Sequence, residues 1–232
     1  MRRSTTTTLA LSTVVAALAL TGCAGPAEPA GTSPASSASA PRGDSAPSAP
    51  APLSSAQLSE RLLTGRDLGE GYTREPEAPR RSGDVAVIGC PALEKLGTGA
   101  ATGSGLAFPR KAKVSFTYTG SSSSELGEEL YSDSPAKLSR GIGKVFDAML
   151  SCRSFQVASG SSVIDVRTER ASVPDLADER WSQLLTFSAG GQRRIVKQTA
   201  ARTGNLLVIV SGNPGLVDAH LARAVGKAQR TR

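Results

Sequence analysis

The sequence predicts a single α+β domain, a twisted antiparallel sheet covered on one side by helices, behind a signal peptide and a disordered stalk. Three consecutive strand-like segments are joined by tight turns at residues 190–191 (Gly-Gly) and 203–205 (Thr-Gly-Asn), a pattern typical of antiparallel neighbours. Helical patterns precede and follow these segments, as expected for helices that pack on a sheet. Residues 53–232 are numerous enough for one domain with a substantial core.

Residues 1–22 have the plan of an export signal. Arg2 and Arg3 give a positive start, and residues 9–20 are apolar apart from one serine and one threonine. As a helix this apolar run spans about 18 Å, too short to cross a hydrocarbon core of about 30 Å. Residues 20–23, Leu-Thr-Gly-Cys, follow at once and resemble the lipobox of bacterial lipoproteins.

The lipobox resemblance implies a diacylglycerol thioether on Cys23, cleavage before Cys23, and acyl chains such as palmitate in the bilayer. Two or three acyl chains hold a protein on a membrane durably, where one chain does not. We therefore expect a lipid anchor at the extracytoplasmic face of the cell membrane. The alternative is an ordinary secretory signal with an incidental cysteine.

Residues 23–52 form the predicted lipidated linker. Seven of residues 24–52 are proline, and no apolar side chain in this segment is larger than alanine. Ordering the segment would cost conformational entropy that nothing offsets, so we expect a disordered or partly polyproline stalk. Its reach is roughly 30 Å as a flexible coil and about 90 Å when extended.

The folded part begins with short helices. Residues 54–63 start with a capping box in which Ser54 and Gln57 satisfy each other's backbone N–H groups. A second short helix opens at Cys90, which is followed by proline, and ends at Gly97.

A strand and a long helix are predicted next. Residues 112–118 alternate apolar and polar side chains, the period of a half-buried strand. Ser134 followed by proline starts a helix with apolar residues at helical spacing, which ends at Cys152. Between them lies an acidic run, expected to be a solvated turn, with a calcium site as the alternative. It comprises Glu125, Glu128, Glu129 and Asp133.

The C-terminal half reads mainly as strands, followed by a helix that begins at residues 213–214 (Asn-Pro). The last strand is apolar on both faces, which is typical of a central position. The predicted strands are residues 155–158, 163–170, 180–187, 193–202 and 206–210.

The three cysteines indicate an oxidised domain. If lipid occupies Cys23, then Cys90 and Cys152 remain as an even pair in an oxidising compartment. A disulfide between them is the prediction, with two buried free thiols as the alternative.

Enzyme signatures are thin. The single histidine, His220, lies at the edge of an apolar helical stripe, as a boundary residue would. Residues 134–137 match a Ser-x-x-Lys pattern, but the Ser-x-Asn and Lys-Thr-Gly elements of penicillin-recognising enzymes are missing. Without a second histidine or spare thiolate, zinc ligands are lacking. We therefore expect no catalytic residues, no metal and no cofactor.

The formal net charge is +7. Aromatic residues make up only 4%, too few for the stacking platforms of single-stranded nucleic-acid binders, so no nucleic-acid partner is expected. A basic surface suits anionic lipid headgroups or wall polymers, although it also suits plain solubility. The basic clusters lie at residues 80–81, at 110–113, and at 193–194 with Lys197.

Four features carry a family resemblance: residues 67–72 (Asp-Leu-Gly-Glu-Gly-Tyr), residues 90–93 (Cys-Pro-Ala-Leu), the helix ending at Cys152, and residues 204–208 (Gly-Asn-Leu-Leu-Val). With them the chain resembles actinobacterial cell-envelope lipoproteins. More distantly it is similar to the extracellular sensor domain of mycobacterial kinase H. This resemblance implies an antiparallel α+β domain with a cleft for an envelope ligand. The chain departs from that sensor domain in having one cysteine pair instead of two, and no kinase domain is attached to it.

We thus expect a non-enzymatic ligand-binding or sensor-like module of the cell envelope, which takes a small molecule or lipid. The alternative is a structural or assembly lipoprotein that docks another envelope protein or an anionic wall polymer. Candidate cleft residues combine a polar tip with an apolar body, although such residues also serve in cores and rims. They are Tyr72, Arg110, Tyr118 and Trp181.

Overall fold

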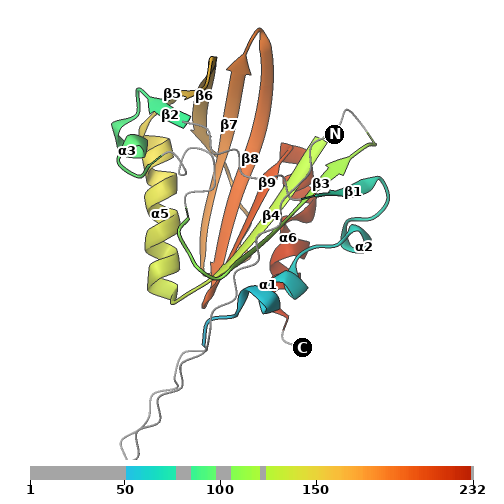
Figure 1. Cartoon of the computed structure of the whole chain (residues 1–232). Coiled ribbons are helices and arrows are strands. Elements are labelled where there is room, and N and C mark those ends of the chain that lie inside the picture. The colour runs from blue at the N-terminus through green and yellow to red at the C-terminus, as the bar shows by residue number, and fades with distance from the viewer. Residues whose placement is uncertain (1–50, 77–84, 98–105, 121–123, 231–232) are drawn as a thin grey trace, which may run out of the picture. The chain divides into compact units, whose positions relative to one another are not determined.

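The computed structural model describes residues 51–76, 85–97, 106–120 and 124–230. These residues are built around one antiparallel sheet with the strand order β1-β3-β4-β9-β8-β7-β6-β5-β2 (Figure 1). The fold is α+β, as predicted. The strands are β1 Tyr72–Glu75, β2 Val85–Ile88, β3 Lys111–Tyr118, β4 Ser124–Ser132, β5 Ser154–Ser159, β6 Ser162–Arg170, β7 Glu179–Ala189, β8 Gln192–Thr203 and β9 Leu206–Gly212. The helices are α1 Ser55–Arg61, α2 Gly65–Leu68, α3 Pro91–Glu94, α5 Pro135–Ser151 and α6 Pro214–Gln229.

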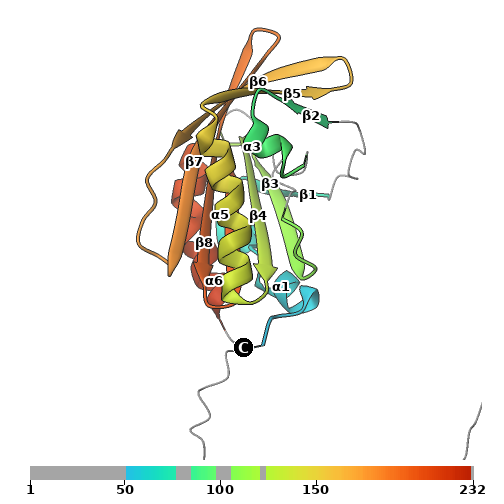
Figure 2. The same ribbon diagram turned by 90° about the vertical axis from the view of Figure 1, so that its left-hand side faces the viewer.

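Helices cover both faces of the sheet, but over different strands. Helices α1 and α6 pack on β3, β4, β8 and β9, whereas α5 packs on β6 to β9 from the opposite face and α3 packs on β2. Figure 2 shows α5 in front of the sheet and α6 behind it. The expectation of helices on one side is therefore wrong. Both faces of the strands carry apolar side chains, so each face needs a helix.

The sheet separates two apolar clusters, and β9 contributes to both. Leu207 and Ile209 belong to the cluster under α5, while Leu206, Val208 and Val210 belong to the cluster under α6. All five are buried. This confirms the prediction of a central strand, and burial of each such side chain contributes about 1.5–3 kcal/mol.

The N-terminal capping predicted from the sequence forms in full at α1 but only in part at α5. The Ser54 N–H donates to Gln57 Oε1 at 2.8 Å, and the Gln57 N–H donates to Ser54 Oγ at 3.3 Å, so the capping box forms. Ser134 occupies the N-cap position of α5, but its side chain makes no capping hydrogen bond. Its backbone N–H instead donates to Asp133 Oδ1 at 2.7 Å.

The acidic run is strand β4, so the prediction of a solvated turn is wrong. Strand β4 pairs with β3 on one side and with β9 on the other. Leu126, Glu128 and Leu130 alternate onto the face under α1 and α6, where all three are buried. The edge strands β1 and β2 are further elements that the sequence analysis did not predict.

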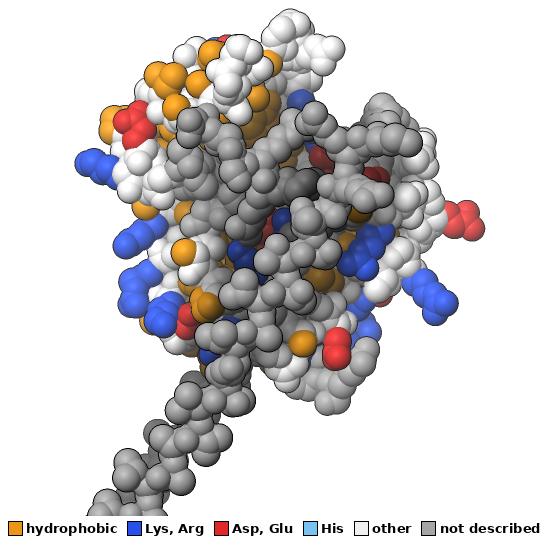
Figure 3. Space-filling model, viewed as in Figure 1, with side chains coloured by type: hydrophobic (Ala, Val, Ile, Leu, Met, Phe, Trp, Pro, Cys, Tyr) orange, Lys and Arg blue, Asp and Glu red, His pale blue; other side chains and the backbone are white. Residues whose placement is uncertain are grey.

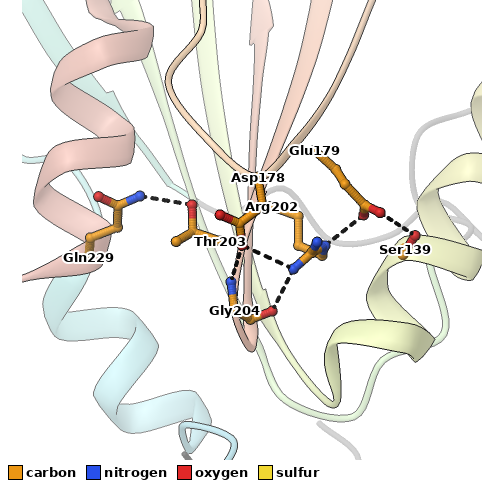
Figure 4. A network of polar contacts seen from close by, with 7 residues as sticks. All are labelled: Ser139, Asp178, Glu179, Arg202, Thr203, Gly204 and Gln229. Atoms are coloured by element: carbon orange, nitrogen blue, oxygen red, sulfur yellow. Dashed lines mark hydrogen bonds and ion pairs between the residues drawn. The ribbon is translucent and has the colours of Figure 1, made fainter. Parts of the chain in front are cut away.

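A polar network ties α5 to the β8–β9 turn (Figure 4). The Arg202 guanidinium bonds Glu179 Oε2 at 2.6 Å and the Gly204 carbonyl at 3.1 Å. Ser139 of α5 donates to the other oxygen of Glu179 at 3.0 Å. Asp178 accepts from the Gly204 N–H at 2.9 Å. Helix α5 is thus held to the sheet by polar contacts at its N-terminal half as well as by its apolar face.

Cys90 and Cys152 form a disulfide, which joins the start of α3 to the end of α5. The pair predicted from the sequence is therefore bonded. The predicted signal peptide, the predicted lipid site Cys23 and nearly all of the predicted linker lie outside the described residues.

Candidate functional site

A groove of about 670 Å³ lies on the sheet at strands β1, β3 and β4. This volume is within the range of small-molecule sites in proteins. The groove is lined by Arg74, Glu75, Pro76, Lys113, Val114, Ser115, Gly127, Glu128 and Glu129.

Small residues from adjacent strands form the floor of the groove. Ser115 lies opposite Glu75 on one side and opposite Gly127 on the other, and Gly127 in turn lies opposite Ser211 of β9. Residues opposite each other in antiparallel strands share a face. A Cβ atom on Gly127 would lie 3.3 Å from Ser211 Oγ, so any side chain here would take up groove space.

The same polar row continues across the sheet and passes under α5. Ser211 lies opposite Gln198, which lies opposite Gln183. Gln183 is fully buried, and its Nε2 atom donates to Gln198 Oε1 at 2.9 Å and to Met149 Sδ of α5 at 2.8 Å. The groove floor therefore lies on the face of the sheet that bears α5.

The lining carries both signs of charge. On the face of the groove floor, Lys113 is cationic, and Glu75 and Glu129 are anionic. Arg74 borders the groove from edge strand β1 but lies opposite Phe116, on the face under α6. Glu75 Oε1 accepts from Thr117 Oγ1 at 2.7 Å, and the hydroxyl of Tyr131 donates to Glu129, so both carboxylates are oriented by neighbours. A groove of this kind can bind a small polar molecule through charged groups at its rim and hydroxyl and backbone groups at its floor.

Two of the four candidate cleft residues meet. Tyr72 and Tyr118 lie opposite each other on β1 and β3, with ring centroids 4.7 Å apart. The Tyr72 hydroxyl also lies 2.7 Å from Nε2 of His220 on α6. None of these three residues lines the groove.

The other two candidates lie elsewhere. Trp181 packs against the cluster under α5, whereas Tyr72 packs against the cluster under α6 on the opposite face. Arg110 is exposed just before β3. The four residues therefore do not line a common cleft. An amphipathic side chain can serve either face of a sheet, and composition does not reveal which one.

His220 joins α6 to the edge strand β1. Burial, and then the nearby charge of Arg223, lower the pKa of His220. Burial and then the neighbouring Tyr118 raise the pKa of Tyr72. Both groups are therefore neutral near pH 7, and the tyrosine can donate to the imidazole. This contact is structural, because it fastens an edge strand of only four residues.

Glu128, which the sequence places in a solvated turn or a calcium site, is buried instead. Its side chain is 1% exposed, and its Oε2 atom accepts from the Leu63 N–H at 2.6 Å. Its Oε1 atom has no hydrogen-bond partner in the described part of the chain. Burial raises the pKa of Glu128 to about 7, against the lowering effects of the Leu63 N–H and Lys227. The pattern in the sequence that indicates its burial is its position between Leu126 and Leu130, two residues from each, as on one face of a strand.

The described members of the basic clusters are divided between the two faces of the sheet. Lys113 lines the groove. Arg194 pairs with Glu125 at 2.7 Å, and Lys197 is buried and pairs with Asp218 of α6 at 2.5 Å. Residues 80–81 lie outside the described residues.

The described residues contain neither a membrane-spanning helix nor a cluster of metal ligands. Their helices are too short or too polar to cross a membrane. No three of their His, Cys, Asp and Glu side chains are grouped to hold a metal ion.

Comparison with solved structures identifies the fold. The extracellular domain of PknH from Mycobacterium tuberculosis is similar, with a TM-score of 0.58 over 78% of this chain and 99% of that one, at 11% identity. A weaker likeness, with a TM-score of 0.40 at 12% identity, joins 79% of this chain to 99% of an uncharacterised protein from Mycobacterium smegmatis. No protein-family model matches the chain. No curated protein matches it either.

Proposed function

We propose that the protein is a lipid-anchored, extracytoplasmic binding module of the cell envelope, without catalytic activity. The Leu-Thr-Gly-Cys motif at residues 20–23 supports the anchor at Cys23. The disulfide between Cys90 and Cys152 suits an oxidising compartment. The fold shared with an extracellular domain of another protein is consistent with that location.

The groove on β1, β3 and β4 carries the binding proposal. Its volume suits a small molecule, and its floor of small residues is flanked by the cation Lys113 and by the anions Glu75 and Glu129. We propose a small polar ligand bearing both a cationic and an anionic group, or a strong dipole. Charges of both signs in the lining favour such a ligand over a fully apolar lipid tail, because an apolar ligand would desolvate the charges without compensation.

The test is native mass spectrometry of the mature protein from its own host. We expect a bound small molecule on the wild type and its loss from Gly127→Leu, whose side chain fills the groove. The matched control is Gly226→Leu on α6, where an added Cβ meets no atom within 4 Å. Thermal unfolding of both variants shows whether the fold is retained.

Two outcomes count against the groove. One is a ligand that stays on a folded Gly127→Leu protein, which would place the site elsewhere. The other is a wild type that carries no ligand and shows no binding when it is screened against polar envelope metabolites.

A second candidate function is assembly with another envelope protein. Ile88, Val163 and Ile195 are 48%, 51% and 43% exposed. Each lies next to a residue packed in the cluster under α5 and therefore points to the opposite face. Ile88 and Val163 lie on β2 and β6, beyond the strands that α6 covers, and Ile195 lies near the start of β8. Crosslinking in the native envelope that captures one protein with the wild type, and not with Ile88→Ser/Val163→Ser, would favour this function.

A further inference from the structure

A basic stripe runs along the exposed side of α5. It consists of Lys137, Arg140 and Lys144, which follow each other at intervals of three and four residues and are all exposed. Residues at this spacing share one side of a helix. Figure 3 shows Lys and Arg side chains gathered at the edge of the molecule where Figure 1 places α5.

The stripe carries little compensating negative charge. Lys137 lies 3.5 Å from Asp133, and within the described ranges Arg140 and Lys144 have no ion pair. By contrast, Lys197, Arg202 and Lys227 each pair with a carboxylate. The charge of the stripe therefore faces solvent.

Only two further carboxylates belong to the exposed surface of α5 and its neighbour α3. They are Asp147 on α5 and Glu94 on α3. Exposed Lys95 follows Glu94 directly, and exposed Arg153 follows the C-cap residue of α5. This surface is positive on balance. The apolar side of α5 is committed to the core, so the helix cannot insert into a bilayer and can only lie on one.

We propose that the basic stripe of α5 docks the domain on the anionic headgroups of the membrane that holds its anchor. The proposal relies on the lipid anchor proposed above, which brings the surface within reach. The described chain begins at Ala51, and the Ala51 carbonyl accepts a hydrogen bond from Asn205 Nδ2 at 2.7 Å. The Asn205 carbonyl in turn accepts from the N–H of Asp133 at 3.3 Å, and Asp133 lies just before α5. The stripe therefore begins at the end of the domain where the stalk enters, and a stalk of up to about 90 Å permits this contact.

The experiment uses the mature chain from residue 23 to 232 with Cys23→Ser, so that no lipid anchor contributes. Cosedimentation is measured with vesicles of phosphatidylcholine alone and with added phosphatidylglycerol, at low and high salt. We expect binding only to the anionic vesicles at low salt, because exposed charges are screened at high salt. The triple variant Lys137→Gln/Arg140→Gln/Lys144→Gln should bind at least tenfold more weakly.

The matched control is Lys111→Gln/Arg193→Gln/Arg230→Gln, which removes the same charge from exposed positions outside α5. This control should bind like the wild type. Equal losses in the two triple variants would overturn the stripe, since net charge alone would then explain binding. Absence of binding to anionic vesicles, or binding only to isolated wall polymer, would also overturn it. None of these results tests the anchor, which is tested separately by comparing the membrane fractionation of the wild type and Cys23→Ala.

Discussion

At the scale of single residues, Glu128 is unusual because its carboxyl group is buried instead of exposed to water. A carboxylate with an unpaired, buried oxygen is costly to ionise, because no water or donor compensates the charge. The nearest ion pair, between Lys227 and Asp67 at 2.5 Å, lies close enough to influence it. Burial raises the pKa of Asp67, but hydrogen bonds from Lys227 and Thr64 outweigh it and bring that pKa to about 2. Asp67 is therefore ionised throughout the pH range in which Glu128 titrates.

The pH dependence of stability follows from Glu128. Burial raises its pKa from 4.5 to about 7, so between these values the folded protein keeps a proton that the unfolded chain loses. The free energy of unfolding should fall as pH rises through this window, by up to about 3 kcal/mol. Glu128→Gln keeps an acceptor for the Leu63 N–H, so it should match the wild type near pH 4.5 and exceed it near pH 8.

Urea unfolding of both proteins at several pH values measures this difference. Glu125→Gln, whose carboxylate is exposed, serves as the control and should follow the wild type through the window. Parallel curves for the wild type and Glu128→Gln would show that Glu128 is ionised in the folded protein throughout.

At the scale of elements, the disulfide joins two helices, and both helices and the cysteine pairing are predicted from the sequence. Cys90 and Cys152 are separated by 62 positions, and α3 otherwise packs on α5 and on the short edge strand β2. Closing a loop of this size restricts the unfolded chain most strongly, because long loops have more conformations to lose.

Removal of the disulfide should therefore destabilise the domain. We expect Cys90→Ala/Cys152→Ala to lower the free energy of unfolding by about 2–4 kcal/mol, measured by urea unfolding without reductant. Adding reductant to the wild type should reproduce most of this loss and leave the double variant unchanged. Two reactive thiols in the denatured, unreduced wild type would contradict the bond itself.

Sequence patterns predicted helices and strands correctly where the spacing of apolar residues indicates which side chains are buried. Helix α5 was predictable because its apolar residues recur at helical spacing, and β9 because it is apolar on both faces. Strand β4 was missed because Glu125, Glu128 and Glu129 suggest solvent, although pairing with β3 and β9 places Glu128 inside. Whether a polar residue within a strand is buried or exposed depends on the strands that pair with it on either side.

At the scale of the whole molecule, the anchor and the domain are separate predictions. Acyl chains on Cys23 hold the protein on the membrane through the burial of many methylene groups. We expect Cys23→Ala to release the protein into the medium, as measured by fractionation and immunoblotting. A variant that still sediments with membranes, and is released by detergent, would show that the thioether is not the anchor.

The sequence alone determined the predicted export signal, the stalk composition, the available cysteine pair and most local elements, because each depends on neighbouring residues. The candidate site depended on tertiary structure. Its floor joins Ser115, Gly127 and Ser211 from three strands, and the contact between Tyr72 and His220 spans 148 positions. Which distant strands pair is decided by packing and hydrogen bonding over the whole sheet, and one residue's shift in register would turn every side chain to the other face.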